Sequence, residues 1–214
     1  MPTILVTGGA GYIGSHTVVE LLAQNYTVVI VDNFCNSKPS SLARVDVRDE
    51  LNLSQVFVKH KIDAVIHFAA LKAVGESVRE PARYYENNVA GSLVLFKVMA
   101  AHQVKSIVFS SSATVYGDPH STPINEDFPL SATNPYGWTK LMMEQILRDM
   151  YQADNSWSIA LLRYFNPVGA HPSGLNGESP INKPNNLVPI ITGVAIGKMA
   201  QLTVYGGDYP TRDG

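Results

Sequence analysis

The feature that most limits the possible folds is a glycine-rich segment near the N-terminus, set between an apolar run and an amphipathic stretch. Residues 4–6 are typical of a buried parallel strand, and residues 9–14 follow with the spacing G-x-G-x-x-G. Residues 15–24 then predict a helix, and residues 26–31 a second strand that ends at Asp32. An ordinary tight turn can carry such glycines, but these elements in this order indicate a βαβ unit that binds a dinucleotide.

The glycines and the acid explain how a dinucleotide is held. Gly8, Gly11 and Gly14 let the chain turn sharply and let backbone N–H groups approach a pyrophosphate at the N-terminus of the helix. Asp32 lies about twenty residues past the loop, where a carboxylate accepts hydrogen bonds from the adenosine ribose. An acid there repels a 2′-phosphate, so the predicted cofactor is NAD and not NADP.

A second motif, Tyr136 and Lys140 in Asn-Pro-Tyr-Gly-Trp-Thr-Lys, lies in the second half of the chain. Residues four apart share one face of a helix, so the ammonium can sit near the phenol oxygen. A cation there favours the phenolate and lowers the tyrosine pKa, which makes a base usable near neutral pH. The spacing alone is equally typical of a surface helix with an extended lysine, and the glycine loop favours the catalytic interpretation.

Composition excludes several classes of function. A 214-residue chain that is 45% hydrophobic can form one substantial core, or one domain and part of another. A net charge of −2 gives no sign of nucleic-acid or anionic-membrane binding, and we expect neither a membrane span nor a signal peptide. The single cysteine, Cys35, and the scattered histidines argue against a disulfide and a metal site, and favour a reducing, cytoplasmic location.

Strand and helix signals alternate along the chain, which predicts an α/β fold with a doubly wound parallel sheet. Residues 63–68, 106–110 and 158–164 predict further strands, and residues 81–103 and 134–152 predict long helices. After Asn166 the composition shifts to Gly, Pro and Asn, followed by an apolar helix over about residues 187–197. We therefore divide the chain into a dinucleotide-binding domain over residues 1–165 and a partial second domain over residues 166–214.

These motifs together resemble the extended short-chain dehydrogenase/reductase family, with its Rossmann fold. The resemblance rests on the glycine loop, Asp32-Asn33, residues 67–77, residues 110–117, the Tyr/Lys pair and residues 163–170. Leu-Lys-Ala-Val-Gly-Glu-Ser and Tyr-Phe-Asn-Pro-Val-Gly-Ala-His-Pro-Ser-Gly are similar to the branch that epimerises UDP-sugars at C4. The resemblance implies NAD-dependent interconversion of UDP-galactose and UDP-glucose, in galactose metabolism, by transient oxidation at C4.

The resemblance also implies a catalytic role for each motif residue. Tyr136 takes the proton of the 4-hydroxyl while C4 passes a hydride to the nicotinamide, and Lys140 lowers the tyrosine pKa and bonds the nicotinamide ribose. Ser112 hydrogen-bonds the reacting oxygen, with Thr114 assisting. Without the other motifs, residues 110–112 are equally typical of a polar turn after a strand.

Binding residues follow from the same resemblance, although single positions also have structural explanations: Asn87 can cap a turn and Phe165 can belong to the core. The residues implied to hold NAD are Gly8, Gly11, Tyr12, Ile13, Gly14, Asp32, Asn33, Asn36, Ser37, Asp46, Val47, Phe68, Ala69, Ala70, Lys72, Asn87, Tyr136, Lys140 and Phe165. Those implied to contact the UDP-sugar are Lys72, Ser112, Ala113, Thr114, Tyr136, Tyr164, Asn166, Asn186, Leu187, Thr203, Val204 and Tyr205.

Two departures from the family pattern affect these expectations. Residues 33–45 must supply a whole crossover between parallel strands, which normally takes at least about ten to twelve residues, so the third strand near residues 44–47 should be stunted. The family also continues beyond Gly214, into segments that bind the uridine diphosphate and size the sugar pocket. We therefore expect a truncated chain with an internal deletion, a poor enzyme whose apolar residues 187–197 lack partners.

Alternatives remain open at this point. A nucleotide-sugar 4,6-dehydratase needs an acidic residue beside the active-site threonine, whereas Thr114 is followed by Val115 and Tyr116. A catalytically inactive NAD-binding chain is the alternative of a different class. The sequence leaves open the acceptance of N-acetylated sugars and the oligomeric state, although related enzymes often form homodimers.

Overall fold

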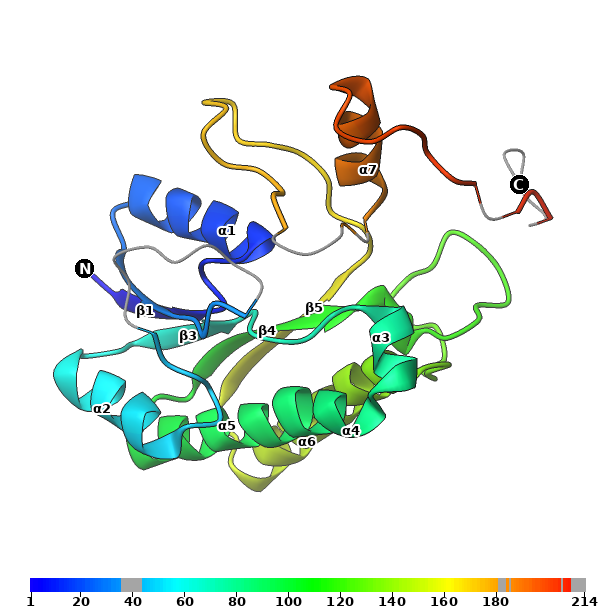
Figure 1. Cartoon of the computed structure of the whole chain (residues 1–214). Coiled ribbons are helices and arrows are strands. Elements are labelled where there is room, and N and C mark those ends of the chain that lie inside the picture. The colour runs from blue at the N-terminus through cyan, green and yellow to red at the C-terminus, as the bar shows by residue number, and fades with distance from the viewer. Residues whose placement is uncertain (36–43, 181–183, 185, 205, 209–214) are drawn as a thin grey trace.

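A five-stranded parallel sheet forms the centre of the computed structural model, which describes residues 1–35, 44–180, 184, 186–204 and 206–208 (Figure 1). Its strands lie in the order β2-β1-β3-β4-β5, and every neighbouring pair is parallel. Their bounds are β1 Thr3–Thr7, β2 Thr27–Val31, β3 Ala64–His67, β4 Ser106–Ser112 and β5 Ser158–Tyr164. Because all strands run in one direction, their carboxyl ends share one edge of the sheet, where α/β proteins of this kind bind ligands.

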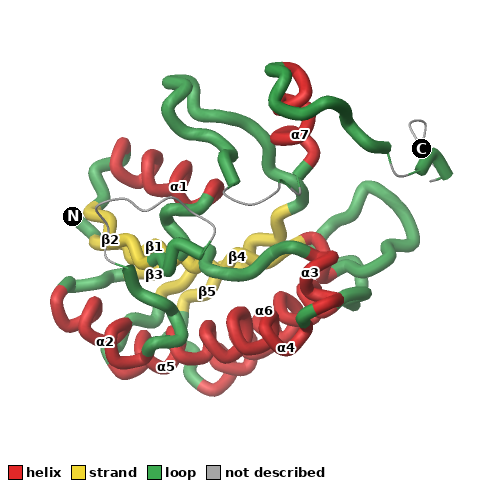
Figure 2. The backbone as a smooth tube through the Cα atoms, in the orientation of Figure 1, coloured by secondary structure: helices red, strands yellow, loops and turns green. Residues whose placement is uncertain are grey.

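Helices cover both faces of the sheet, as the predicted doubly wound fold requires (Figure 2). Helix α1 lies on one face, and α2, α5 and α6 lie on the other. The helical bounds are α1 Tyr12–Ala23, α2 Glu50–Lys59, α3 Val74–Arg79, α4 Pro81–Tyr84, η1 Tyr85–Ala90, α5 Gly91–Ala101, η2 Ala113–Val115, α6 Pro135–Ala153 and α7 Leu187–Ala195.

The hydrophobic core lies between the sheet and the α2-α5-α6 layer. Apolar residues recur at helical spacing on these three helices and meet buried residues of the strands. The core includes Leu5, Leu53, Phe57, Val65, Leu95, Met99, Ile107, Phe109, Met143 and Leu147. This packing fixes the strand ends and the start of α6 relative to one another.

The third strand of the sequence prediction is stunted, as expected. Among the described residues it consists of one parallel bridge between Asp32 and Arg44, with a backbone hydrogen bond of 3.2 Å from Val45 to Asp32. A single bridge cannot extend the sheet, so β2 is its last full strand on that side.

Helix α7 packs loosely against the rest of the described chain. No residue of α7 is buried, although the helix is strongly apolar. On the outer strand β5, Ser158, Ala160 and Leu162 are exposed along one face. Leu162 is 42% exposed. Among the described residues, α7 is thus only partly covered, which is compatible with the expectation that its apolar face lacks partners.

Candidate active site

The glycine loop forms a closely packed turn at the carboxyl end of β1. Gly8 has φ +68°, and a side chain on it would meet the backbone of Ala69 at 2.7 Å. A Cβ on Gly14 would overlap the carbonyl of Gly8. Gly11 caps α1 without any side-chain hydrogen bond, so the first backbone N–H groups of the helix remain for a ligand. A bare helix N-terminus behind closely packed glycines fits the pyrophosphate of NAD.

Asp32 lies beside this loop, as predicted. Its carboxylate accepts hydrogen bonds from the backbone N–H groups of Ala10 at 3.1 Å and Phe34 at 2.8 Å. The acid is thus held at the edge of the glycine loop, in the position where a ribose would meet it.

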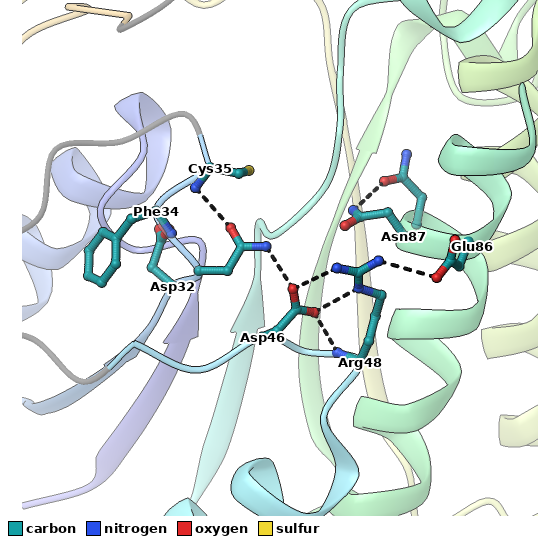
Figure 3. A network of polar contacts seen from close by, with 9 residues as sticks. Asp32, Phe34, Cys35, Asp46, Arg48, Glu86 and Asn87 are labelled. Atoms are coloured by element: carbon teal, nitrogen blue, oxygen red, sulfur yellow. Dashed lines mark hydrogen bonds and ion pairs between the residues drawn. The ribbon is translucent and has the colours of Figure 1, made fainter. Parts of the chain in front are cut away.

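Past Asp32, a cavity of about 440 Å³ is lined by Asn33, Cys35, Arg44, Asp46 and Arg48. Asn33 donates to Asp46 at 2.9 Å, and the guanidinium of Arg48 makes two hydrogen bonds of 2.9 Å to the same carboxylate (Figure 3). Hydrogen bonds from Arg48 hold the pKa of Asp46 far below its usual range. The structure therefore brings two predicted adenosine-side residues together, and Asn36 and Ser37 lie outside the described residues.

The loop after β3, predicted to approach the nicotinamide, is held by Asn88, and the cofactor contact expected of Asn87 stays a prediction. Asn88 accepts from the N–H of Leu71 at 2.8 Å, donates to its carbonyl at 2.9 Å, and donates to Thr139 of α6 at 3.1 Å. Asn87 donates to the Asn88 side chain at 2.9 Å. Both asparagines lie in the π-helical turn η1, which interrupts the long helix predicted over residues 81–103.

At the carboxyl end of β4, three predicted residues meet. The Ser112 side chain lies close enough to the phenol of Tyr136 to lower the pKa that burial raises, and its hydroxyl accepts from Thr114 Oγ1 at 3.0 Å. Asn134 caps α6 by accepting from the N–H of Gly137 at 2.9 Å, which fixes the first turn that carries Tyr136. A serine and a tyrosine thereby lie at the same edge of the sheet as the glycine loop.

Lys140 lies one turn further along α6 and is buried. Its Nζ donates to the carbonyl of Ser110 at 2.7 Å and lies 5.9 Å from the centre of the Tyr136 ring. Burial lowers the pKa of Lys140 to about 8. Burial also raises the pKa of Tyr136, which the Ser112 side chain offsets in part. The expectation that Lys140 lowers the tyrosine pKa stays a prediction.

The predicted sugar-side residues are only partly assembled. Lys72 pairs with Glu178 at 3.7 Å, and Asn186 donates to the same carboxylate. Tyr164 packs near Phe68 with ring centres 6.4 Å apart, and Phe165 stacks on Tyr116 at 6.5 Å.

The remaining sugar-side predictions concern exposed residues. Asn166, Leu187, Thr203 and Val204 are exposed, and the segment after α7 extends away from the sheet in Figure 1. Tyr205 lies outside the described residues. The roles given to these residues stay predictions.

Several groups around the site carry no motif that would have revealed them. Arg48 follows Asp46 by two residues, a spacing too common to be a signal. Glu144 and Arg163 form a buried ion pair behind Ser111, and only the fold brings them together. Across the described residues, no cluster of side chains could hold a metal ion, and no helix is long and apolar enough to cross a membrane.

A family model described as the NAD dependent epimerase/dehydratase family matches residues 4–213. The chain belongs to this family. The NAD predicted from the glycine loop and Asp32 is therefore confirmed as the cofactor of the family, and the short-chain dehydrogenase/reductase resemblance is confirmed with it.

Relatives and solved structures agree with this assignment. The chain is 59% identical to UDP-glucose 4-epimerase of Bacillus subtilis, over 99% of this chain and 66% of the relative. It is 58% identical to the Neisseria meningitidis protein of the same name, over 100% of this chain and 67% of the relative. The Bifidobacterium longum UDP-glucose 4-epimerase, solved with NAD+ and UDP, superimposes with a TM-score of 0.95 at 55% identity, over 99% of this chain and 67% of that one.

The chain thus spans about two thirds of the length of the relatives it matches. The alignment with the Bacillus subtilis relative runs over 224 positions, more than the 214 residues of this chain. That relative therefore contains residues with no counterpart here, in agreement with the predicted shortening.

Proposed function

We propose that this protein catalyses the NAD-dependent interconversion of UDP-galactose and UDP-glucose. The observation that carries the proposal is that Ser112 and Tyr136 lie close together at the carboxyl end of β4, where the Ser112 side chain lowers the tyrosine pKa, two strands from the glycine loop after β1. Support also comes from the relatives named UDP-glucose 4-epimerase, at 59% and 58% identity.

The side chains supply acid–base chemistry around a sugar hydroxyl. NAD, when bound, supplies reversible oxidation at the sugar C4. Tyr136 takes the proton of the 4-hydroxyl and later returns it, and Ser112 hydrogen-bonds the same oxygen. Lys140, whose Nζ donates to the carbonyl of Ser110, would bond the nicotinamide ribose of NAD.

Binding of the substrate is assigned to the residues on either side of this pair. Lys72, Tyr164 and Asn186 are proposed to contact the UDP-sugar, with residues 166–214 contributing to its binding domain. Asp32, Asn33 and Asp46 are proposed to bind the adenosine half of NAD, where the cavity beyond Asp32 has room for it.

The test compares the chain with its Tyr136→Phe variant, each loaded with NAD, in an assay for conversion of UDP-galactose to UDP-glucose. The variant should lose two or more orders of magnitude in turnover, because the proton acceptor is gone, while its NAD content stays unchanged. Near-normal turnover by the variant would contradict the assignment of the base. A wild-type chain that retains NAD but converts no UDP-sugar would favour a non-catalytic NAD-binding role.

The related 4,6-dehydratase activity is a weaker candidate. That chemistry needs an acid next to Thr114, and Val115 is apolar and buried. Formation of a 4-keto-6-deoxy sugar in the same assay would reverse this preference.

We further propose a place in galactose metabolism, a cytoplasmic location and a possible homodimer. The single cysteine, which is free and exposed, is compatible with a reducing compartment. Sedimentation of the NAD-loaded chain would decide between monomer and dimer.

A further inference from the structure

Glu144 is a carboxylate with no exposed side-chain surface, and the proposed chemistry does not use it. It lies on α6, one helical turn beyond Lys140 and two beyond Tyr136. Burying a carboxylate is costly unless charged partners and hydrogen bonds compensate for the lost water. The fold must therefore supply those partners.

Three side chains satisfy Glu144. Arg163 of β5 donates from Nε to Oε1 at 3.0 Å and from Nη2 to Oε2 at 2.8 Å, which is the bidentate geometry that arginine favours. Arg148 donates to Oε2 at 2.9 Å. Ser111 of β4 donates its hydroxyl to Oε1 at 2.5 Å. Burial raises the pKa of Glu144, but the hydrogen bonds from Arg163 and Ser111 lower it below its usual value.

The contact with Ser111 matters because of its neighbours in the strand. Successive side chains of a strand point to opposite faces, so the side chains of Ser111 and Ser112 emerge on opposite sides of β4. On the face that α6 covers, Glu144 accepts from the hydroxyl of Ser111. The carbonyl of Ser110 accepts from Lys140, so α6 binds two consecutive residues of β4. The next residue, Ser112, lies at the end of the strand, near enough to Tyr136 in the first turn of α6 to lower the tyrosine pKa.

Arg163 extends the same hold to a third element. Its Nη1 donates to the phenol of Tyr116 at 2.9 Å, just past the η2 turn that follows Ser112. The guanidinium also lies 4.9 Å from the centre of the Tyr116 ring. The hydrogen bonds of Glu144 and Arg163 thus connect α6, the end of β4, the η2 turn and β5 around Ser112 and Tyr136.

We propose that Glu144 is a positioning residue, which holds Ser112 against Tyr136 through Ser111 and Arg163. The inference rests on the roles proposed above for Ser112 and Tyr136. A buried ion pair is by itself weak evidence of stability, since the cost of desolvating the charges offsets their attraction. Its geometric consequence is definite, because a shift of about 1 Å at a reacting group can cost a hundredfold in rate.

Ser111→Ala is the sharpest test, because it removes one hydroxyl and leaves the Glu144–Arg163 pair in place. The ionisation of Tyr136 is measured in the NAD-loaded chain by ultraviolet difference titration. Each protein is compared with the same protein that also carries Tyr136→Phe, so that the difference reports Tyr136. Since the Ser112 contact lowers the pKa of Tyr136, Ser111→Ala should move its ionisation to higher pH, in the same direction as Ser112→Ala. Turnover should fall roughly tenfold in kcat with KM little changed.

Ser106→Ala, which removes a hydroxyl at the other end of β4, is the matched control and should leave both readouts unchanged. Glu144→Gln keeps an oxygen that accepts from Ser111, so it should shift Tyr136 less than Glu144→Ala. Thermal melting shows whether each variant folds.

Unchanged ionisation of Tyr136 in folded Ser111→Ala would overturn the proposal, and so would equal shifts in the Gln and Ala variants of Glu144. The two proposals fail in different ways. A wild-type chain without turnover would refute the proposed function, and the titration would still decide the positioning role.

Discussion

At the scale of the single residue, Lys140 shows a conflict between function and stability. Its ammonium is buried against Phe109, and its one hydrogen bond in the described structure goes to a backbone carbonyl. Burial lowers the pKa of Lys140 to about 8 from an ordinary 10.5. Below pH 8 both the folded and unfolded chains carry the proton, and the folded chain bears the full cost of burying the charge.

Replacing Lys140 by Met should therefore stabilise the protein at pH 7, on the order of 2 kcal/mol, while removing activity. Between about pH 8 and 10.5 only the unfolded chain binds the proton, so the free energy of unfolding of the wild type should rise with pH. The difference in stability between the wild type and Lys140→Met should then disappear. Urea unfolding at pH 7, 9 and 10 measures this. A stability difference between the two proteins that does not depend on pH would show that the buried charge is not its cause.

Asp32 carries the second prediction at this scale. Asp32→Ala should weaken NAD retention roughly tenfold to a hundredfold, because a charged hydrogen-bond acceptor worth about 1.5–3 kcal/mol is lost. It should also relax the bias against NADP. Asp63→Ala is the matched control, since Asp63 likewise accepts a backbone N–H, from Thr3, at the opposite end of the sheet. Equal affinity of the unmutated chain for NAD and NADP would already refute the role.

At the scale of the element, the glycine loop shows how helix α1 is set against its strand. The loop must bring the first turn of α1 against the carbonyl of Gly8, and a Cβ on Gly14 would overlap that carbonyl. The same close approach exposes the helix N-terminus to the cofactor. Packing and binding therefore depend on one backbone contact.

Gly14→Ala should push α1 away from the loop and cost about 1–3 kcal/mol of stability, together with most NAD binding. Gly75→Ala is the control, because a Cβ at Gly75 would meet only the Arg79 side chain, at 3.8 Å. Thermal melting with and without added NAD measures both effects. If Gly14→Ala keeps the stabilisation by NAD, α1 is not held as described.

At the scale of the whole molecule, a chain of buried hydrogen bonds crosses the fold beneath the glycine loop. Ser92 donates to the carbonyl of Asn88 at 2.6 Å, so it accepts from Nε2 of His67 at 2.8 Å. Burial lowers the pKa of His67 and so favours the neutral ring, in which Nδ1 accepts from Thr7 at 2.6 Å. This chain of hydrogen bonds joins β1, β3 and the π-helical turn.

Burial, together with the charge of Lys140, lowers the pKa of His67 to about 3. Between pH 6.5 and 3 the unfolded chain binds a proton that the folded chain does not, so stability should fall with acidification by up to about 1.4 kcal/mol per pH unit. Urea unfolding at pH 7, 6 and 5 checks this. The free energy of unfolding of His67→Gln should change less with pH than that of the wild type, whereas the variant with the exposed His120 replaced by Gln should behave as the wild type does. Equal pH dependence in the wild type and both variants would contradict the assignment.

Much of this architecture was predictable because it depends on local patterns. Strands such as residues 158–164 are short apolar runs beside polar loop residues, and the glycine spacing around Gly11 is a strict backbone requirement. The stunted third strand also followed from counting residues between Asp32 and Asp46. The π-helical turn and the choice of Asn88 over its neighbour Asn87 did not follow, because the phase of a helix at that point is set by packing against α6.

The sequence by itself determined the βαβ order, the glycine loop with Asp32 beside it and the Tyr136/Lys140 helix, since each rests on spacing within one short segment. The tertiary structure alone decided that Glu144 meets Ser111 and Arg163, and that Tyr136 is buried enough for desolvation to raise its pKa. Burial and long-range ion pairs depend on which segments the core brings together. No local pattern records those neighbours, because they are distant in the chain.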